Sequence, residues 1–304
     1  MTTLLISHTD CLYHDTGDGH PERPDRLRAI LHALDEEAFP DLLRREAPLA
    51  TREQLARVHD DAYLDTLIAR APERGTIYLD PDTVMSPGSL SAALRAAGAV
   101  CAAVDAVLAG EVTNAFCAVR PPGHHAEPHQ AMGFCLFNNV AVGAAHARAQ
   151  HGIAKIAIVD FDVHHGNGTQ AAFLDDPQTF FASCHQWPLY PGTGREQDLG
   201  KGPLVNVCLP PFADGAAFRA RMEERVLPEL DLFRPDLVMI SAGFDAHVND
   251  PLANLNYEDD DYRWITEQLM TISDGRIVST LEGGYDLGAL ASAGAAHVRA
   301  LMAA

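Results

Sequence analysis

The stretch that decides the fold is Ile156-Ala-Ile-Val-Asp160-Phe-Asp162-Val-His164-His165-Gly166-Asn167-Gly168. It begins with a short apolar run without polar alternation, which is typical of a strand buried on both faces of a parallel sheet. At the two-residue period of a strand, Asp160, Asp162 and His164 project from the same side, at the carboxyl end of that strand. Such a cluster is costly to bury unless it holds a cation. The alternative is a strand-terminal turn of Asp, Asn and Gly, which leaves the same-side repetition unexplained.

Similar apolar runs recur along the whole chain. Each is short, rich in β-branched or aromatic residues, and nearly free of charge, so we expect each to be a buried strand. Besides Ile156–Asp160, the expected strands are Leu4–Ser7, Phe116–Val119, Thr179–Ser183, Leu204–Leu209, Leu237–Ser241 and Ile277–Leu281.

Helical patterns separate these runs. Alternation of strands and helices predicts a parallel sheet with helices on both faces. No Gly-, Ser- or Pro-rich linker and no long repeat divides the 304 residues, so we predict one α/β domain over residues 1–304. In such sheets ligands bind beyond the carboxyl ends of the strands. The expected helices are Pro24–Leu34, Ser89–Leu108, Asn138–His151, Ala216–Leu232, Asp259–Ser273 and Leu287–Leu301.

Composition excludes several classes of protein. Hydrophobic residues make up 47% and charged residues 21%, so the chain is neither disordered nor fibrous. The 22 basic and 42 acidic residues give a net charge of −20, which repels a phosphate backbone. We therefore expect no nucleic-acid partner, whereas a cationic ligand fits. The alternative is that the acidic surface only aids solubility.

Cysteine usage and hydropathy indicate the compartment. The six cysteines contain no C-x-x-C pair, so we expect reduced, buried thiols. The N-terminal residues show no signal-peptide pattern, and even the Ala-rich stretch 89–110 is interrupted by Arg95 and Asp105. We expect a cytoplasmic protein that does not enter a membrane.

A further carboxylate, Asp245, follows another predicted strand in Ser241-Ala-Gly-Phe-Asp245-Ala-His247. Asp162, His164 and Asp245 would then supply three oxygen and nitrogen ligands and leave a fourth position open for water. That pattern is typical of a catalytic rather than a structural zinc site. The alternative for Asp245 alone is a helix N-cap.

Two other strand ends carry residues suited to proton transfer. His124 and His125 follow the rigid Arg120-Pro-Pro-Gly123 turn, and a neutral imidazole is well suited to proton transfer near neutral pH. The alternative is a solvated loop. The last strand runs into Glu282-Gly283-Gly284-Tyr285, where Gly283 and Gly284 let the backbone approach a ligand and present the Tyr285 hydroxyl.

Taken together, these motifs resemble the zinc-dependent histone deacetylase family. The resemblance spans nearly the whole chain and is strongest to the class II-like branch, which includes bacterial amidohydrolases and acetylpolyamine amidohydrolases. It is carried by His20–Leu27, Val58-His59, Arg120–Ala126, Gly133–Asn139, Asp160–Gly168, Ser241–His247 and Glu282–Tyr285.

The resemblance implies a three-layer α/β/α arginase-deacetylase fold with an eight-stranded parallel sheet, whose eighth strand would be Arg45–Leu49. It also implies one zinc ion on Asp162, His164 and Asp245. His125 would act as general base and then as acid, and Tyr285 would donate to the carbonyl oxygen and the oxyanion.

The same resemblance assigns supporting roles. His124 would assist electrostatically and be oriented by Asp160. Asn167 would stand behind His125, where the class I branch has an Asp, and this would make His125 less basic. A structural potassium ion would be held by Asp160, Asp162, His164 and Ser183, and a second near Phe173.

The substrate tunnel is also implied by resemblance. Phe134, next to Gly133, and Tyr190 would form its walls, with Gly283 close to the substrate. Arg26 matches an arginine that lines an internal channel, and its alternative is a surface salt bridge. His59, His185 and His247 are interpreted as structural.

We therefore expect a zinc-dependent amidohydrolase that removes a short acyl group from an amine, most simply acetyl-lysine in a peptide or protein. The alternatives are an acetylpolyamine amidohydrolase, an arginase-like ureohydrolase with two manganese ions, and a non-catalytic acyl-amine binder. Asp80 and Asp82 are candidates for a rim that grips the substrate backbone or a distal amine. The sequence leaves acyl length, physiological metal and the choice between monomer and homo-oligomer open.

Overall fold

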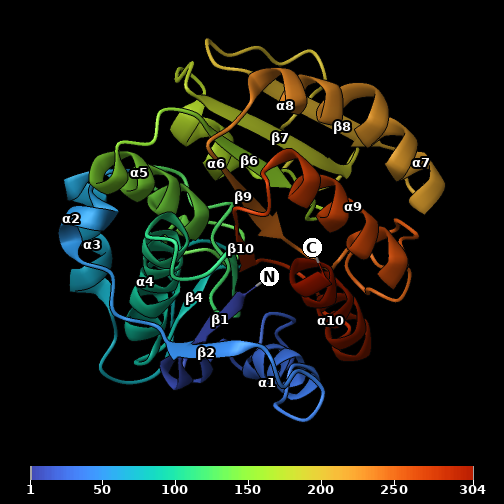
Figure 1. Cartoon of the computed structure of the whole chain (residues 1–304). Coiled ribbons are helices and arrows are strands. Elements are labelled where there is room, and N and C mark those ends of the chain that lie inside the picture. Colours follow the sequence, from blue (N-terminus) through green and yellow to red (C-terminus); the bar gives the residue numbers. More distant parts are fainter. Residues whose placement is uncertain (1, 304) are drawn as a thin grey trace.

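Eight parallel strands form the sheet that runs through the molecule, in the order β2-β1-β5-β10-β9-β6-β7-β8 (Figure 1). The structure is a computed structural model and describes residues 2–303. The strands are β1 (Thr3–Ser7), β2 (Leu43–Glu46), β5 (Asn114–Cys117), β6 (Ile156–Asp160), β7 (Thr179–Gln186), β8 (Leu204–Leu209), β9 (Leu237–Ala242) and β10 (Ile277–Leu281). A separate antiparallel pair, β3 (Ile77–Tyr78) and β4 (Val84–Met85), lies outside this sheet.

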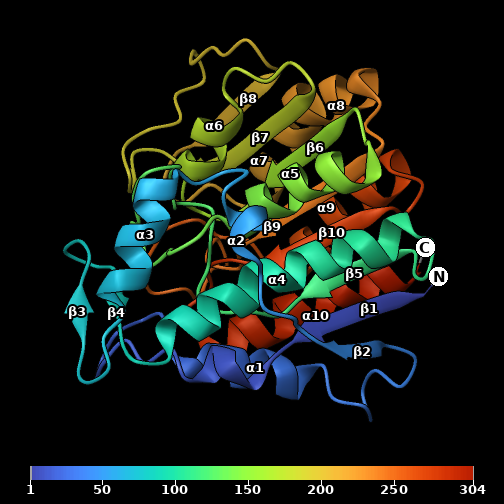
Figure 2. The same ribbon diagram turned by 90° about the vertical axis from the view of Figure 1, so that its left-hand side faces the viewer.

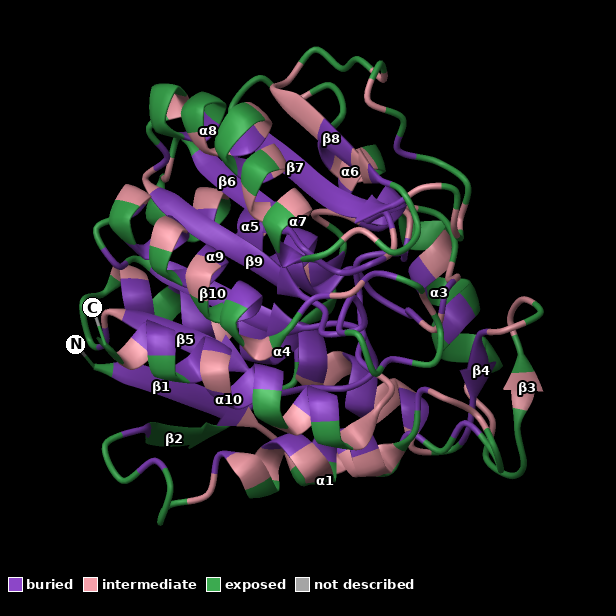
Figure 3. Cartoon of the chain, turned by 90° about the vertical axis from the view of Figure 1, so that its right-hand side faces the viewer, coloured by how far each residue is buried: buried purple, intermediate pink, exposed green. Residues whose placement is uncertain are grey.

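Helices cover both faces of the sheet, which makes three layers and confirms the predicted α/β/α fold. One face carries α4 (Ser89–Leu108), α5 (Asn139–His151) and α6 (Asn167–Phe173) (Figure 2). The other carries α1 (Pro24–Ala33), α7 (Gly215–Arg221), α8 (Leu227–Phe233), α9 (Asp259–Ile272) and α10 (Leu287–Ala303) (Figure 3). The short helices η1 (Thr9–Leu12) and α2 (Arg52–Leu55) and the longer α3 (Asp61–Arg70) complete the described elements.

The buried core follows from the apolar runs of the central strands. All residues of β5, β6, β7, β9 and β10 are buried (Figure 3). Helix α4 is long and apolar enough to cross a membrane by composition alone, but 67% of its most apolar stretch is buried inside the protein. Its apolarity is therefore that of a core helix.

Several boundaries differ from the sequence expectation; β7, for example, extends to Gln186 rather than ending at Ser183. Two strands differ for a clear physical reason. The eighth strand is Leu43–Glu46 rather than Arg45–Leu49, because all four residues of β2 are exposed and Pro48 has no N–H to donate. The strand expected at Phe116–Val119 is β5, Asn114–Cys117. It starts two residues earlier, at the buried Asn114, whose side-chain amide donates to the Leu301 carbonyl. A search for apolar runs does not detect a strand that begins with such a polar residue.

The helix expected at Ala216–Leu232 is interrupted. Between α7 and α8 lies a five-residue π-helical segment, η2 (Met222–Val226). Pro228 follows at the start of α8 and cannot donate a backbone hydrogen bond, so the preceding turn widens. The interruption explains why one predicted helix is observed as three consecutive segments.

Candidate active site

The candidate active site lies at the carboxyl ends of four neighbouring strands. The sheet order places β5, β10, β9 and β6 side by side. The loops that follow them contain His124 and His125, Tyr285, Asp245, and Asp162 with His164, respectively. Parallel strands end at the same sheet edge, so residues separated by up to half of the chain come together here.

Asp162, His164 and Asp245 form a convergent set of metal donors. The His164 Nδ1 atom lies 3.1 Å from Asp162 Oδ1 and 3.2 Å from Asp245 Oδ2. One donor atom from each of the three residues falls within 4.8 Å of the others. The loop is fixed by backbone bonds, because the N–H of Val163 donates to Asp245 Oδ1 at 2.9 Å.

The surroundings of this set fit a metal ion. Asp245 Oδ2 is buried and has no hydrogen-bond partner among the described residues. A Cβ atom on Gly243 would come within 2.0 Å of Asp162 Oδ2, and one on Gly283 within 2.0 Å of Asp245 Oδ2. Both glycines therefore keep space for the carboxylates to face the site.

The charge balance at the set points the same way. Burial lowers the pKa of His164, but the neighbouring carboxylates Asp162 and Asp245 outweigh this and raise it to about 10. The two buried carboxylates thus draw a positive charge into the site. A divalent cation meets that requirement with ligands of the right type for zinc.

His125 is oriented so that one ring nitrogen is free. Its Nδ1 lies 2.8 Å from Asn167 Oδ1, while the Asn167 amide donates through Nδ2 to Glu127 Oε1 at 2.8 Å. Since the amide oxygen faces the ring, Nδ1–H is the donor, and Nε2 keeps a lone pair. Burial, with His124 and His164 nearby, holds the pKa of His125 well below its usual range. The ring is therefore a neutral base.

His124 has the opposite electrostatic environment. Its Nδ1 donates to Asp160 Oδ2 at 2.8 Å, and its Nε2 lies 3.8 Å from Asp162 Oδ1. Burial lowers its pKa, yet the carboxylates of Asp160 and Asp162 raise it well above the usual value. The two adjacent imidazoles, whose ring centres lie 4.0 Å apart, therefore differ in charge: His124 is charged and His125 is neutral.

Tyr285 is held between a cation and a carboxylate. The Arg26 guanidinium carbon lies 4.8 Å from the centre of the Tyr285 ring, and the Tyr285 N–H donates to Asp250 Oδ2 at 2.6 Å. Burial raises the pKa of Tyr285 well above its usual value, so the hydroxyl keeps its proton and can donate. Gly284, at φ +118°, allows the turn that precedes it.

These groups face one cavity of about 230 Å³, the tunnel. It is lined by Asp82, Pro122, His124, His125, Gly133, Phe134, His164, Leu189, Tyr190, Leu252, Gly283 and Tyr285. The Tyr190 ring stands edge-on to His125 at 5.2 Å, and Phe134 edge-on to Tyr285 at 5.9 Å. Gly133 is required beside them, because a Cβ there would lie 2.4 Å from His125 Cδ2.

Four candidate residues lie elsewhere. Asp80 lines a neighbouring cavity rather than the tunnel. Arg26 is fully buried behind Tyr285 and donates to the carbonyls of Gly284 and Glu282, so it does not form a surface salt bridge. Ser183 and Phe173, expected at the two potassium sites, do not line the tunnel: Ser183 pairs in register with Asp160, and Phe173 ends α6. The potassium assignments stay predictions.

The site also uses residues to which the sequence reasoning gave no role. Buried Glu282 accepts the backbone N–H groups of Gly123 (2.6 Å) and His124 (3.1 Å), which fixes the loop of the histidine pair. Asp250 accepts the Tyr285 N–H, and through Oδ1 it also accepts the Leu252 N–H. Glu282 stood within a quoted motif, whereas Asp250 had no sequence signal.

A second cluster of metal-binding residue types consists of Asp105, His146 and His151. It is better described as a set of hydrogen bonds that connects helix α4 to helix α5. Both ring Nε2 atoms lie within 2.8 Å of Asp105 Oδ1. Arg57 donates to His146 Nδ1 at 2.9 Å, so His146 carries its proton on Nε2 and presents no lone pair there.

Comparison with known proteins agrees with this geometry. Residues 20–301 match the family described as "Histone deacetylase domain". The chain is 40% identical to histone deacetylase 14, chloroplastic, of Arabidopsis thaliana (98% of this chain, 76% of the relative). It is 41% identical to the histone deacetylase-like amidohydrolase of Pseudomonas aeruginosa (88% and 73%) and 36% identical to polyamine deacetylase HDAC10 of Homo sapiens (99% and 48%). The crystal structure of the HDA15 HD domain superposes with a TM-score of 0.95 at 36% identity (99% and 88%).

Proposed function

The chain belongs to the histone deacetylase family and is a hydrolytic deacetylase, and on that premise we propose that its substrate is an acyl-lysine in a peptide or protein. The observation that carries this proposal is the tunnel. Its volume of about 230 Å³ is lined by His125, Tyr285 and the metal donor His164, and Asp82 is the one carboxylate among its lining residues. A slender apolar acyl-lysine stem suits such walls.

The residues divide the chemistry among them. Asp162, His164 and Asp245 would hold a zinc ion, which would supply the Lewis acidity that polarises an amide carbonyl and lowers the pKa of a water molecule. We assign to His125 Nε2 the removal of a proton from the attacking water and its later delivery to the leaving amine. The charged His124 stabilises the negative charge that develops beside it, and the Tyr285 hydroxyl donates to the oxyanion.

The arrangement supports a deacetylase over the same-fold alternatives. An arginase-like centre needs a second metal, yet His247 is engaged elsewhere, since its Nδ1 accepts the Asn249 N–H and its Nε2 lies 3.5 Å from Asp259. A binder without catalysis would not require the neutral base, charged imidazole and phenol donor together.

A polyamine substrate is the second candidate. One relative is named a polyamine deacetylase, the net charge here is −20, and Asp82 at the tunnel would attract a distal ammonium group. Side-by-side kcat/KM values on an acetyl-lysine peptide and an acetylated polyamine decide the matter. A preference for the peptide supports the proposal, whereas a large preference for the polyamine, abolished in Asp82→Asn, replaces it.

We also propose that the enzyme acts in the cytoplasm. All six cysteines are free thiols, and five are buried, as expected for a reducing compartment. Fractionation of cells that express the chain tests this, and recovery in a membrane or extracellular fraction would contradict it.

A further inference from the structure

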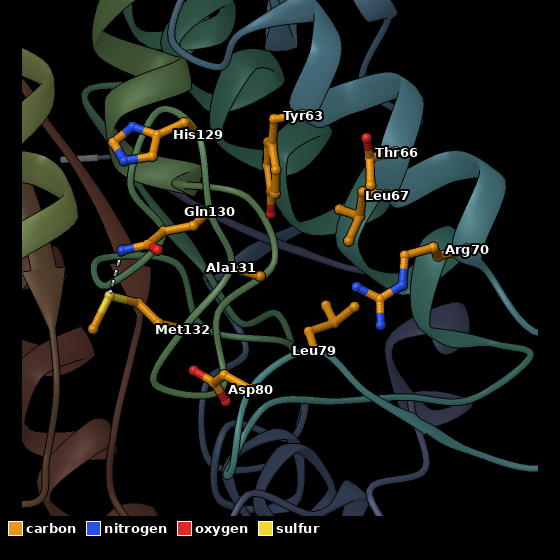
Figure 4. A pocket seen from close by; sticks show the side chains of 10 residues that line it. All are labelled: Tyr63, Thr66, Leu67, Arg70, Leu79, Asp80, His129, Gln130, Ala131 and Met132. Carbon is orange, nitrogen blue, oxygen red and sulfur yellow. Dashed lines mark hydrogen bonds between the residues drawn. The ribbon is translucent and has the colours of Figure 1, made fainter.

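We propose that a second cavity beside the tunnel, the outer pocket, is a subsite for substrate residues that flank the acyl-lysine, and that it takes an apolar side chain together with an acidic group. The inference rests on the proposed peptide substrate. The outer pocket measures about 350 Å³ and lies between α3, the loop after β3 and the loop before Gly133 (Figure 4).

The outer pocket and the tunnel share a wall. Asp80 lines the pocket and Asp82 the tunnel, and Asp80 Oδ1 accepts the N–H groups of Asp82 (2.9 Å) and Thr83 (2.6 Å). Thr83 Oγ1 in turn accepts the Phe134 N–H at 3.1 Å. On the other side, Met132 of the pocket directly precedes Gly133 of the tunnel. A peptide that leaves the tunnel mouth toward α3 would therefore pass over this shared wall.

The distance suits neighbouring peptide residues. Arg70 at the far side of the pocket donates through Nη2 to the Tyr78 carbonyl at 3.1 Å. Tyr78 and Asp82 are four residues apart, so they lie at most about 14 Å from each other. An extended peptide covers that distance in about four residues. A group two to four positions from the acyl-lysine can thus reach Arg70.

The lining defines what the pocket takes. Leu67, Leu79 and Ala131 supply an apolar surface, and Figure 4 shows the Arg70 guanidinium directed toward the space among them. A guanidinium has five N–H donors, and among the described residues Arg70 forms no ion pair with a carboxylate. Its spare donors can hold a carboxylate with two parallel hydrogen bonds.

The acidic surface of the chain does not oppose this assignment. A net charge of −20 repels an acidic peptide at long range, but repulsion between exposed charges is largely screened beyond about 8 Å at physiological salt. The contact between an acidic side chain of the peptide and Arg70 inside the pocket is short-range, so salt screens it much less. An apolar neighbour on Leu67 and Leu79 adds burial that is independent of charge.

Arg70 and Thr66 are suitable positions for a test because both are exposed and neither lines the tunnel. Met132 is not, because its sulfur lies 3.3 Å from the Asn167 amide that orients His125. Arg74 provides a matched control: it is exposed, four residues along from Arg70, and does not line the pocket.

The experiment compares Arg70→Glu with Arg74→Glu on three substrates: acetyl-lysine blocked at both ends, an acetyl-lysine peptide followed by Leu and Glu, and the same peptide with Lys in place of that Glu. We expect Arg70→Glu to lower kcat/KM for the Glu peptide about tenfold through KM, to raise it for the Lys peptide, and to leave the blocked acetyl-lysine unchanged. Arg74→Glu should change none of these ratios. Equal effects of the two variants would overturn the subsite, since they would report only net charge.

The apolar part of the subsite is tested with Thr66→Trp, whose ring fills the pocket, against Thr66→Ala. The two substrates are the acetyl-lysine peptide followed by Leu and Glu, and the same peptide with Gly in place of that Leu. Thr66→Trp should reduce kcat/KM for the Leu peptide to the value for the Gly peptide, and Thr66→Ala should not. No difference between the two variants would remove the apolar half of the proposal.

Failure of the proposed function is recognised separately. The blocked acetyl-lysine reports whether the enzyme deacylates lysine at all. Binding of the labelled Glu peptide to the Tyr285→Phe protein reports the pocket without turnover, and Arg70→Glu should weaken it about tenfold while Arg74→Glu does not. If turnover is absent and the two arginine variants still differ in peptide binding, the proposed function is wrong and the subsite stands. If turnover is present and the two variants bind the peptide equally, the proposed function stands and the subsite is wrong.

Discussion

The single atom that decides how His125 works is the Asn167 oxygen. Asn167 Oδ1 accepts the His125 Nδ1–H at 2.8 Å without adding charge, so burial keeps the pKa of this imidazole well below its usual range. A carboxylate in that place would raise the pKa of His125 by about 1 to 3 units. The base is needed in its neutral form, so activity disappears as the pH falls through this pKa.

We therefore expect Asn167→Asp to move the acidic limb of the kcat/KM profile to higher pH by about 1 unit or more. The pH profile of kcat/KM measures this directly. Asn256→Asp is the control, because it adds the same charge to a side chain that bonds the Phe212 carbonyl and does not line the tunnel. It should leave the limb in place. A limb that stays put or moves to lower pH in Asn167→Asp would show that His125 is not the titrating base.

Tyr285 has its backbone and its ring held by other groups, so its hydroxyl can be removed without moving the loop. The Tyr285 N–H is bound by Asp250, and Arg26 packs on the ring. Tyr285→Phe should keep its fold and zinc content and lose about 10²- to 10³-fold in kcat, with little change in KM. Zinc analysis and steady-state kinetics check this, and undiminished turnover would eliminate the oxyanion role.

At the residue scale, motif spacing was sufficient to predict that Asp162, His164 and Asp245 converge. It could not predict the role of Glu282, because that carboxylate binds the backbone N–H groups of Gly123 and His124, which lie about half the chain away in sequence. Backbone groups carry no sequence signature. Their partners become visible only when β5 and β10 are seen to be neighbours.

At the scale of elements, the location of each buried strand was predicted, with the largest errors at the ends of β5 and β7, whereas the exposed edge strand was displaced. Strand β6 was predicted with its observed ends, Ile156–Asp160, because four consecutive apolar residues lead into the buried Asp160. The edge strand β2 has no buried residue, and its pattern carries no information about pairing. Helix α3 was not predicted, although it forms one side of the outer pocket.

Helix α4 contains a glycine whose effect on stability runs against helix propensity. A Cβ at Gly98 would lie 2.1 Å from the Pro48 carbonyl oxygen and 2.7 Å from the Ala50 nitrogen, and Ala50 N–H already donates to the Leu94 carbonyl at 2.8 Å. The segment after β2 thus crosses α4 at van der Waals distance, and only a residue without a side chain fits.

Gly98→Ala should lower the free energy of unfolding by about 1 to 3 kcal/mol, although Ala is favoured over Gly in a helix by about 1 kcal/mol. Urea unfolding measures the change. As a reference, Ala102→Gly on the half-buried side of α4 should show the ordinary propensity loss of about 1 kcal/mol. If Gly98→Ala instead stabilises the protein, the close crossing is not a constraint.

At the scale of the whole molecule, folding brings two buried carboxylates, Asp162 and Asp245, to one point, and this destabilises the protein unless a cation joins them. Asp245 shows this most clearly, because burial and the neighbouring Asp162 raise its pKa. Its Oδ2 atom has no hydrogen-bond partner among the described residues, although His164 Nδ1 lies 3.2 Å away. In the proposed site, zinc would bind the folded chain through ligands in the loops that follow two separate strands, β6 and β9, and would not find them arranged in the unfolded chain. Zinc should therefore raise the midpoint of thermal unfolding, by an amount equivalent to about 2.7 kcal/mol at a hundredfold excess over Kd.

Asp245→Asn removes one of the opposed charges, so the metal-free variant should unfold at or above the temperature of the metal-free native chain and gain little when zinc is added. Calorimetry of both proteins with and without chelator measures the two effects together. A variant that loses stability without metal yet responds to zinc like the native chain would mean that Asp245 is a structural carboxylate and that the metal is held elsewhere.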